Sequence, residues 1–157
     1  SRDTLAALRR MLGTLRRSDP GSGSAPPLDP APGLADLDNL VIRTRDAGVH
    51  VEVRWCGDRR TLPPDIDLSA FRVIQEAVTN VIRHAGTQRC DVVVDRRDDE
   101  LTIEVTDDGR GSGGGQGYGI SGMRERVGLL DGEFSAGPRP EGGFRVAARI
   151  PVPVGAR

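Results

Sequence analysis

The sequence predicts an α+β fold of two layers, in which a mixed, mostly antiparallel sheet of about five strands carries about three helices on one face. Two kinds of pattern predict this class. Five short segments are typical of strands, most of them because apolar and polar residues alternate: 49–55, 90–96, 101–107, 132–136 and 144–150. Three longer segments repeat apolar residues every three or four positions, as amphipathic helices do: 34–47, 68–84 and 120–130.

Length and composition narrow the class of protein. A chain of 157 residues can hold one domain with a sizeable core and little else. Its 22 basic residues, all arginine, nearly balance 23 acidic ones, so direct contact with nucleic acid or a membrane surface is not expected. The lack of lysine excludes a Walker-type phosphate loop and a Schiff base. Cys56 and Cys90 lie far apart, which predicts reduced thiols rather than a disulfide or a zinc site.

The N-terminal part of the chain is expected to differ from the rest. Leucines at 5, 8, 12 and 15 follow the three-four spacing of a helix that packs on another helix, or on its own domain, so residues 1–17 form a predicted helical stub. Residues 18–32 are rich in Pro, Gly and Ser and are expected to be a linker. The globular domain is then expected to cover residues 33–154, with a short tail at 155–157.

Helix ends are indicated by capping residues. Gly48 is a plausible left-handed cap for the first helix of the domain. Asp67 is expected to cap the long helix Leu68–His84, and Gly86 to end it. A turn at 98–100 is expected to join the second and third strands.

The long helix has one chemically distinctive face. At about 100° per residue, Glu76, Asn80, Arg83 and His84 share one stripe of the helix. The apolar residues of the same segment gather on the opposite side: Phe71, Ile74, Val78, Val81, Ile82 and Ala85. The amide oxygen of Asn80 suits Mg²⁺, which prefers hard oxygen ligands and is often shared with substrate phosphates. Arg83 is suited to phosphate oxygens.

The third strand ends in an acid. Leu101, Ile103, Val105 and Asp107 alternate, so a strand that buries the three apolar side chains also turns Asp107 inward. A buried carboxylate needs a donor, and the exocyclic amino group of adenine is a suitable one. Gly109 and Gly111 would leave room for a base against the backbone.

A glycine-rich run, 111–116, is expected to act as a lid before the next helix. Gly117, Tyr118, Gly119, Ile120 and Gly122 lie at the predicted start of that helix, where free N–H groups and the positive end of the dipole favour phosphate. Residues 117–122 also match the dinucleotide fingerprint G-x-G-x-x-G. That fingerprint should follow a strand directly within a repeated βαβ pattern, so a Rossmann fold is not favoured.

In this order, the three clusters resemble the N, G1 and G2 boxes of the GHKL, or Bergerat-fold, ATPases: sensor histidine kinases, Hsp90, gyrase and MutL. The runs 75–85 and 119–126 most resemble histidine kinases that act on NarL-type regulators. The resemblance covers about Leu68 to Pro151. It implies binding of ATP and Mg²⁺, with Glu76 and Asn80 catalytic, Asn80 on the metal, and Arg83 and His84 at the phosphates.

The resemblance implies that residues 1–17 are the tail of a dimerisation helix, and it also implies partners. A dimeric parent kinase would carry the acceptor histidine on a dimerisation domain and pass phosphate to a response regulator, in the cytoplasm and without membrane contact by this fragment. Neither His84 nor His50 fits the acceptor, because neither is followed by an acidic residue. The family often has threonine after the late glycines, whereas Phe144 follows Gly142–Gly143 here and is a candidate core residue.

Three alternatives stay open on the sequence alone. An ATP-driven clamp and an anti-sigma serine kinase share the fold, and a non-catalytic interaction module would use the pocket only structurally. Glu76 is either an acid–base group or an organiser of the metal's waters.

Overall fold

The computed structural model describes residues 31–57, 61–109 and 119–153. The chain divides into two units, residues 1–31 and 32–157. The expected helical stub, the tail and nearly all of the expected linker lie outside the described residues.

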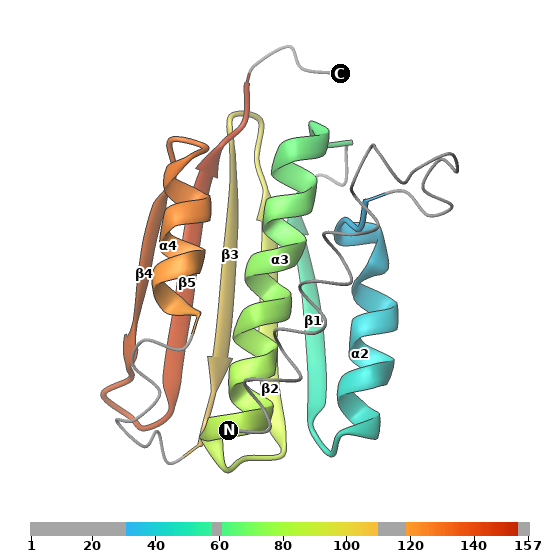
Figure 1. The fold of residues 1–157 in the computed structure, drawn as a ribbon, viewed down its shortest axis with the longest axis vertical. Helices are drawn as coiled ribbons and strands as arrows, with labels where there is room; N and C mark the ends of the chain where they lie inside the picture. The colour runs from blue at the N-terminus through green and yellow to red at the C-terminus, as the bar shows by residue number, and fades with distance from the viewer. Residues whose placement is uncertain (1–30, 58–60, 110–118, 154–157) are drawn as a thin grey trace, which may run out of the picture. The chain divides into compact units, whose positions relative to one another are not determined.

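Five strands form one sheet: β1 (His50–Gly57), β2 (Arg89–Arg96), β3 (Glu100–Asp107), β4 (Glu133–Pro138) and β5 (Phe144–Pro151). Their order across the sheet is β1-β2-β3-β5-β4 (Figure 1). β1 runs parallel to β2, and every other neighbouring pair is antiparallel. The predicted mixed, mostly antiparallel sheet is therefore confirmed.

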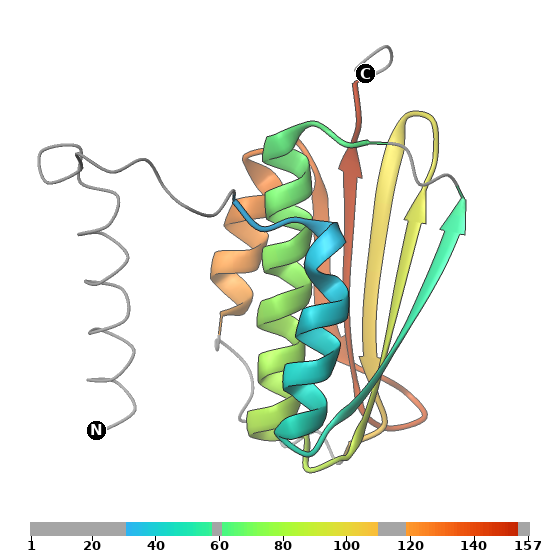
Figure 2. The same ribbon diagram turned by 90° about the vertical axis from the view of Figure 1, so that its right-hand side faces the viewer.

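Helices cover one face of this sheet: η1 (Leu34–Asp36), α2 (Leu37–Asp46), α3 (Pro64–Asn80) with its continuation η2 (Val81–Ala85), and α4 (Ile120–Gly128). Figure 2 shows α2, α3 and α4 side by side in one layer, which confirms the two-layer α+β class. Within the described residues, no helix is both long and apolar enough to cross a membrane.

The core lies between α3 and the sheet. Phe71 and Ile74 of α3 are at most 1% exposed, and they face strand residues that are equally well buried. Inward residues meet across the strands in register pairs that include Val92 with Val105, Val94 with Ile103, and Leu101 with Ile150. Each fully buried side chain of this size contributes about 1.5–3 kcal/mol relative to exposure. The helix-to-sheet contact therefore dominates the stability of the domain.

The opposite face of the sheet is polar. Arg145 pairs with Glu104 at 2.8 Å, and Arg149 pairs with Glu133 at 2.8 Å. Side chains in these pairs are 42–75% exposed, and such surface ion pairs contribute at most about 1 kcal/mol each. This face is thus a solvated surface of alternating charge and not a second core.

The two predicted glycine caps are confirmed, and the predicted Asp67 cap is wrong. Gly48 and Gly86 have φ of 95° and 63°, in the left-handed region that ends helices. α3 begins earlier than predicted, at Pro64, because proline fits the first helical turn, where no N–H is needed. Asp67 therefore lies inside the first turn, where its Oδ1 accepts a hydrogen bond from the Leu34 N–H at 3.0 Å.

The end of the long helix also departs from the prediction. Residues 81–85 form a π-helical turn, in which the backbone hydrogen bonds span one residue more than in an α-helix. Because of this extra residue, the side chains in the turn point in directions that differ from those a regular α-helix of 3.6 residues per turn would give them. Ile82, predicted on the apolar face, is consequently 38% exposed.

Replacement of a central core residue tests this description of the packing. Phe71→Ala should lower the free energy of unfolding by about 3–5 kcal/mol, since it removes a buried ring and leaves a cavity. Leu129→Ala, at a site that is 81% exposed, should change it by no more than about 0.5 kcal/mol. Urea unfolding followed by circular dichroism measures both, and similar losses in the two variants would contradict the assigned core.

Candidate functional site

The three sequence clusters converge at one end of the domain. Figure 1 shows the C-terminal ends of α3 and β3 and the N-terminal end of α4 together at the lower end of the sheet. The helices all lie on one face, so these ends meet on the covered side (Figure 2). Three contacts, described below, join segments that are far apart in the chain.

Asp107, the last residue of β3, is the buried acid of the site. It is 6% exposed, as the alternation of β3 predicted. The Gly109 N–H donates to its Oδ1 at 2.8 Å, and the Phe144 N–H also donates to the carboxylate. Burial raises the pKa of Asp107, and these two hydrogen bonds oppose that rise. The site therefore holds a desolvated carboxyl group whose backbone donors only partly replace its water.

The turn between β4 and β5 encloses Asp107. A Cβ on Gly143 would lie 1.9 Å from the backbone oxygen of Asp107, so a side chain there is excluded. Arg139 Nη1 donates to the same oxygen at 3.0 Å. Phe144 packs against the hydrophobic core, as predicted. Sequence analysis missed the role of Arg139 and Gly143; the only local signal was the glycine pair itself.

A second contact connects the loop after the long helix with the end of β3. Thr87 Oγ1 donates to Asp108 Oδ1 at 2.6 Å, across 21 residues of chain. This hydrogen bond, assisted by Arg89 and Arg139, lowers the pKa of Asp108. The end of η2 and the strand end that carries Asp107 are thereby held at one corner of the domain.

A third contact connects Glu76 with the start of α4. Gly119, the N-cap of α4, has φ of 70°, and a Cβ on it would lie 2.1 Å from Glu76 Oε1. The positive φ favours glycine at this position, and a side chain there would displace the Glu76 carboxylate. The acid of the first cluster thus lies directly against the helix start of the third.

The remaining predicted residues lie around these contacts. Asn80 ends α3 and is partly buried, whereas Arg83 and His84 follow in the π-helical turn, Arg83 exposed and His84 partly buried. Ile120 begins α4, and Gly122 is exposed in its first turn with open space where a Cβ would be. Gly111, Gly117, Tyr118 and the expected lid at 111–116 lie outside the described residues.

Cys90 borders the site without the properties of a nucleophile. It is the register partner of Asp107 on β2 and is fully buried. Burial, assisted by the charges of Asp107 and Asp91, raises the pKa of the Cys90 thiol to about 12. The group is therefore a neutral thiol at physiological pH, as expected for a structural cysteine.

Comparison with known proteins identifies the protein family to which the chain belongs. The model of the family described as histidine kinase-, DNA gyrase B- and HSP90-like ATPases matches residues 66–154. The chain belongs to this family, and its curated relatives are sensor histidine kinases. The sensor histidine kinase YxjM of Bacillus subtilis is 29% identical over 123 residues, which are 76% of this chain and 30% of that protein.

Two further relatives agree with this assignment, and two solved structures have the same fold. The histidine-protein kinase/phosphatases DegS of Brevibacillus brevis and UhpB of Salmonella typhimurium are 26% and 29% identical, over 96% and 92% of this chain. The chain spans only 28–38% of the length of these three relatives. A histidine kinase domain of Erythrobacter litoralis matches the fold with a TM-score of 0.58 at 23% identity, covering 83% of this chain and 66% of that one. The ATP-binding domain of PrrB from Mycobacterium tuberculosis matches with 0.50 at 20% identity, covering 74% and 94%.

The two glycines of the β4–β5 turn form a matched pair for a test. Both have positive φ, but a Cβ on Gly142 meets nothing within 4 Å, whereas one on Gly143 meets Asp107. Both alanine variants should therefore lose roughly 1 kcal/mol or more of stability from backbone strain. Only Gly143→Ala should also weaken ATP binding, by at least about tenfold, because it displaces the acid. Calorimetric titration with ATP measures this, and equal affinities in the two variants would contradict the contact.

Proposed function

We propose that this domain binds Mg-ATP and transfers its γ-phosphoryl group to a histidine on a separate dimerisation domain. The observation that carries the proposal is the buried Asp107 carboxyl group, held by two backbone N–H groups at the corner where the three clusters meet. Family membership and the histidine-kinase relatives support the same reaction.

The described residues fit an adenine nucleotide. A purine amino group would supply the donor that the desolvated Asp107 carboxylate lacks, and a hydrogen bond to a charged acceptor contributes about 1.5–3 kcal/mol. Gly122, in the first turn of α4, is exposed and has open space where a Cβ would lie, so backbone there is accessible to a ligand. We assign Asp107 and Gly109 to the base. We assign the start of α4, with Gly119, Ile120 and Gly122, to the phosphates, together with Gly111, Gly117 and Tyr118.

The end of the long helix is assigned to the triphosphate and its metal. Asn80 offers an amide oxygen of the kind that Mg²⁺ accepts, and Arg83 and His84 follow on the adjoining turn. The metal would neutralise charge on the phosphates when bound. Catalysis of phosphoryl transfer depends mainly on such positioning and charge stabilisation, so no strong base is required.

Glu76 is the acid that we assign to the transfer step. Its carboxylate lies against Gly119, at the proposed phosphate end of the site. We propose that it accepts a hydrogen bond from the acceptor histidine or from a metal-bound water and so orients it for reaction.

The partners follow from the reaction. We expect a homodimeric parent kinase that supplies the histidine and passes the phosphoryl group to a response regulator of the NarL type. Because the reaction consumes ATP, we expect the domain to work in the cytoplasm. A clamp or an anti-sigma serine kinase would use the same nucleotide site but would not label a histidine.

Asp107→Asn should separate binding from stability. Loss of the charged acceptor should weaken ATP binding by about ten- to hundredfold. The native carboxyl binds its proton more tightly than the unfolded chain does, so its contribution to stability is lost as pH rises through the raised pKa. The neutral variant should therefore unfold at higher temperature than the parent at pH 7, with the difference shrinking as pH falls.

Titration calorimetry and thermal unfolding from pH 4 to 8 measure these two effects. Asp91→Asn, which removes a carboxylate from the adjacent strand, is the control and should bind ATP normally. An Asp107→Asn variant that binds ATP as tightly as the parent would refute the adenine assignment.

Transfer itself is tested with labelled ATP and a separately produced dimerisation hairpin that carries the acceptor histidine. The chain should label the hairpin but not itself. Glu76→Gln should bind ATP within about threefold of the parent yet label the hairpin at least about tenfold more slowly. Glu125→Gln, which changes an exposed acid of α4, is the control and should leave both ATP binding and the labelling rate unchanged. Bound ATP without any labelled histidine would favour the non-catalytic module.

A further inference from the structure

The inward face of the β2–β3 ladder carries a charged residue at each end. At one end of the ladder, Asp107 of β3 lies opposite Cys90 of β2. At the other end, Arg96 of β2 lies opposite Leu101 of β3. β2 buries every second residue, and the last of these is Arg96, which is only 5% exposed. The alternation that turns Asp107 inward therefore also turns an arginine inward, at the end of the sheet away from the proposed nucleotide site.

Arg96 has little compensation for this burial. Its Nη1 donates to the backbone oxygen of Arg97, and its buried Nε has no hydrogen-bond partner. Two acids in its surroundings have other partners: Asp95, its chain neighbour, pairs with Arg97 at 3.1 Å, and Asp67, which lines the adjoining cavity, accepts from the Leu34 N–H. No ion pair joins Arg96 to any acid in the described part of the chain. A buried guanidinium without an acid is costly, because its charge is not compensated and its Nε–H donor is not satisfied.

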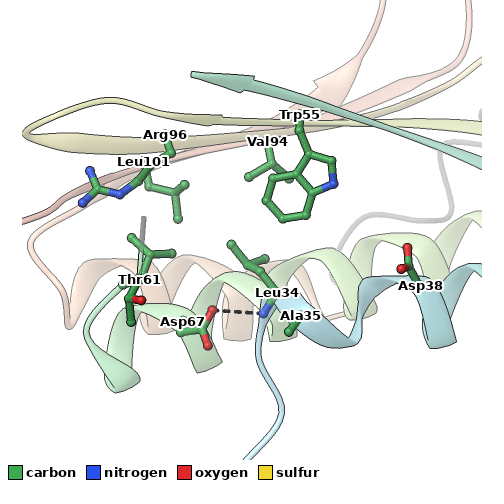
Figure 3. A pocket seen from close by; sticks show the side chains of 10 residues that line it. Leu34, Ala35, Asp38, Trp55, Thr61, Asp67, Val94, Arg96 and Leu101 are labelled. Carbon is green, nitrogen blue, oxygen red and sulfur yellow. Dashed lines mark hydrogen bonds between the residues drawn. The ribbon is translucent and has the colours of Figure 1, made fainter. Parts of the chain in front are cut away.

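A cavity adjoins this arginine. It has a volume of about 440 Å³ and lies between the start of α3, the η1–α2 segment and the sheet. Figure 3 shows Arg96 and Thr61 at one end of the cavity and Trp55 toward the other. The buried Leu34, Val94 and Leu101 form its floor, and the partly exposed Leu62 and Trp55 present accessible apolar surface. The volume falls in the range of small-molecule sites, which combine apolar walls with a few convergent polar groups.

We propose that this cavity binds a small organic anion, a carboxylate with an aromatic or branched apolar body. The carboxylate would pair with Arg96, and the Thr61 hydroxyl lies at the same end to donate a further hydrogen bond. The apolar body would lie against Leu62 and the Trp55 ring. Water would accept hydrogen bonds from Arg96 but would not compensate its charge, whereas a carboxylate would do both. The acids Asp38 and Asp67 on the helix side of the cavity disfavour a multiply charged anion.

Benzoate is a suitable probe, because Trp55 is the only tryptophan of the chain and lines the cavity. Benzoate should change the fluorescence of Trp55 saturably. Benzamide, which has the same shape without the charge, should bind at least tenfold more weakly. Inorganic phosphate, which lacks the apolar body, should have no effect.

Variants inside and outside the cavity distinguish benzoate binding at this site from binding at the nucleotide site. Arg96→Met should weaken benzoate binding at least tenfold and raise the melting temperature, since it removes an uncompensated buried charge. Arg96→Lys, which keeps the charge, should retain part of the affinity even if the methionine variant folds poorly. Arg97→Gln is the matched control with an exposed neighbouring arginine and should bind benzoate normally, as should Asp107→Asn. Benzoate binding that is absent, equalled by benzamide or phosphate, or unchanged in Arg96→Met would overturn the proposal.

Discussion

The site depends on one constraint, the burial of a carboxyl group at the end of β3. A charged oxygen away from water must recover hydrogen bonds, and Asp107 recovers them from the backbone of Gly109 and Phe144. Those donors come from two different segments, the residues after β3 and the start of β5, so both must fold onto the strand end for the acid to be tolerated. The close approach of Gly143 and the Arg139 hydrogen bond are consequences of that requirement. One buried acid thus organises the corner of the domain at which a nucleotide is proposed to bind.

The central helix α3 links this corner to the rest of the molecule. Its middle is the best buried part of the core, which fixes the helix rigidly against the sheet. Its last turns carry the polar residues assigned to metal and phosphates, and the π-helical turn after Asn80 resets the direction of the side chains that follow. Such turns occur frequently at functional sites, because they aim side chains that a regular helix would point elsewhere. Packing energy from the middle of α3 thereby supports the less regular geometry at its end.

Periodicity explains which parts of this structure could be predicted. Alternation located the strands and turned Asp107 inward, and the left-handed glycines marked helix ends, because these signals depend on neighbouring residues alone. The same alternation would have placed Arg96 inward, had it been applied to β2. The π-helical turn, and hence the exposure of Ile82, depends on packing at the helix end. Contacts such as Thr87 with Asp108 and Glu76 with Gly119 join segments distant in sequence, so only the folded chain reveals them.

The two buried charges of the β2–β3 ladder cannot compensate each other. Six residue steps of about 3.3 Å separate Leu101, opposite Arg96, from Asp107, so the charges lie roughly 20 Å apart. At an effective dielectric constant of about 20, their attraction is under ~1 kcal/mol, less than the cost of burying either group. Each of the two buried charges therefore needs a compensating group of its own. Asp107 has backbone donors and a proposed purine. Arg96 has one carbonyl acceptor and a cavity beside it, so the reasoning that assigns a ligand to the acid also supports the ligand proposed for the arginine.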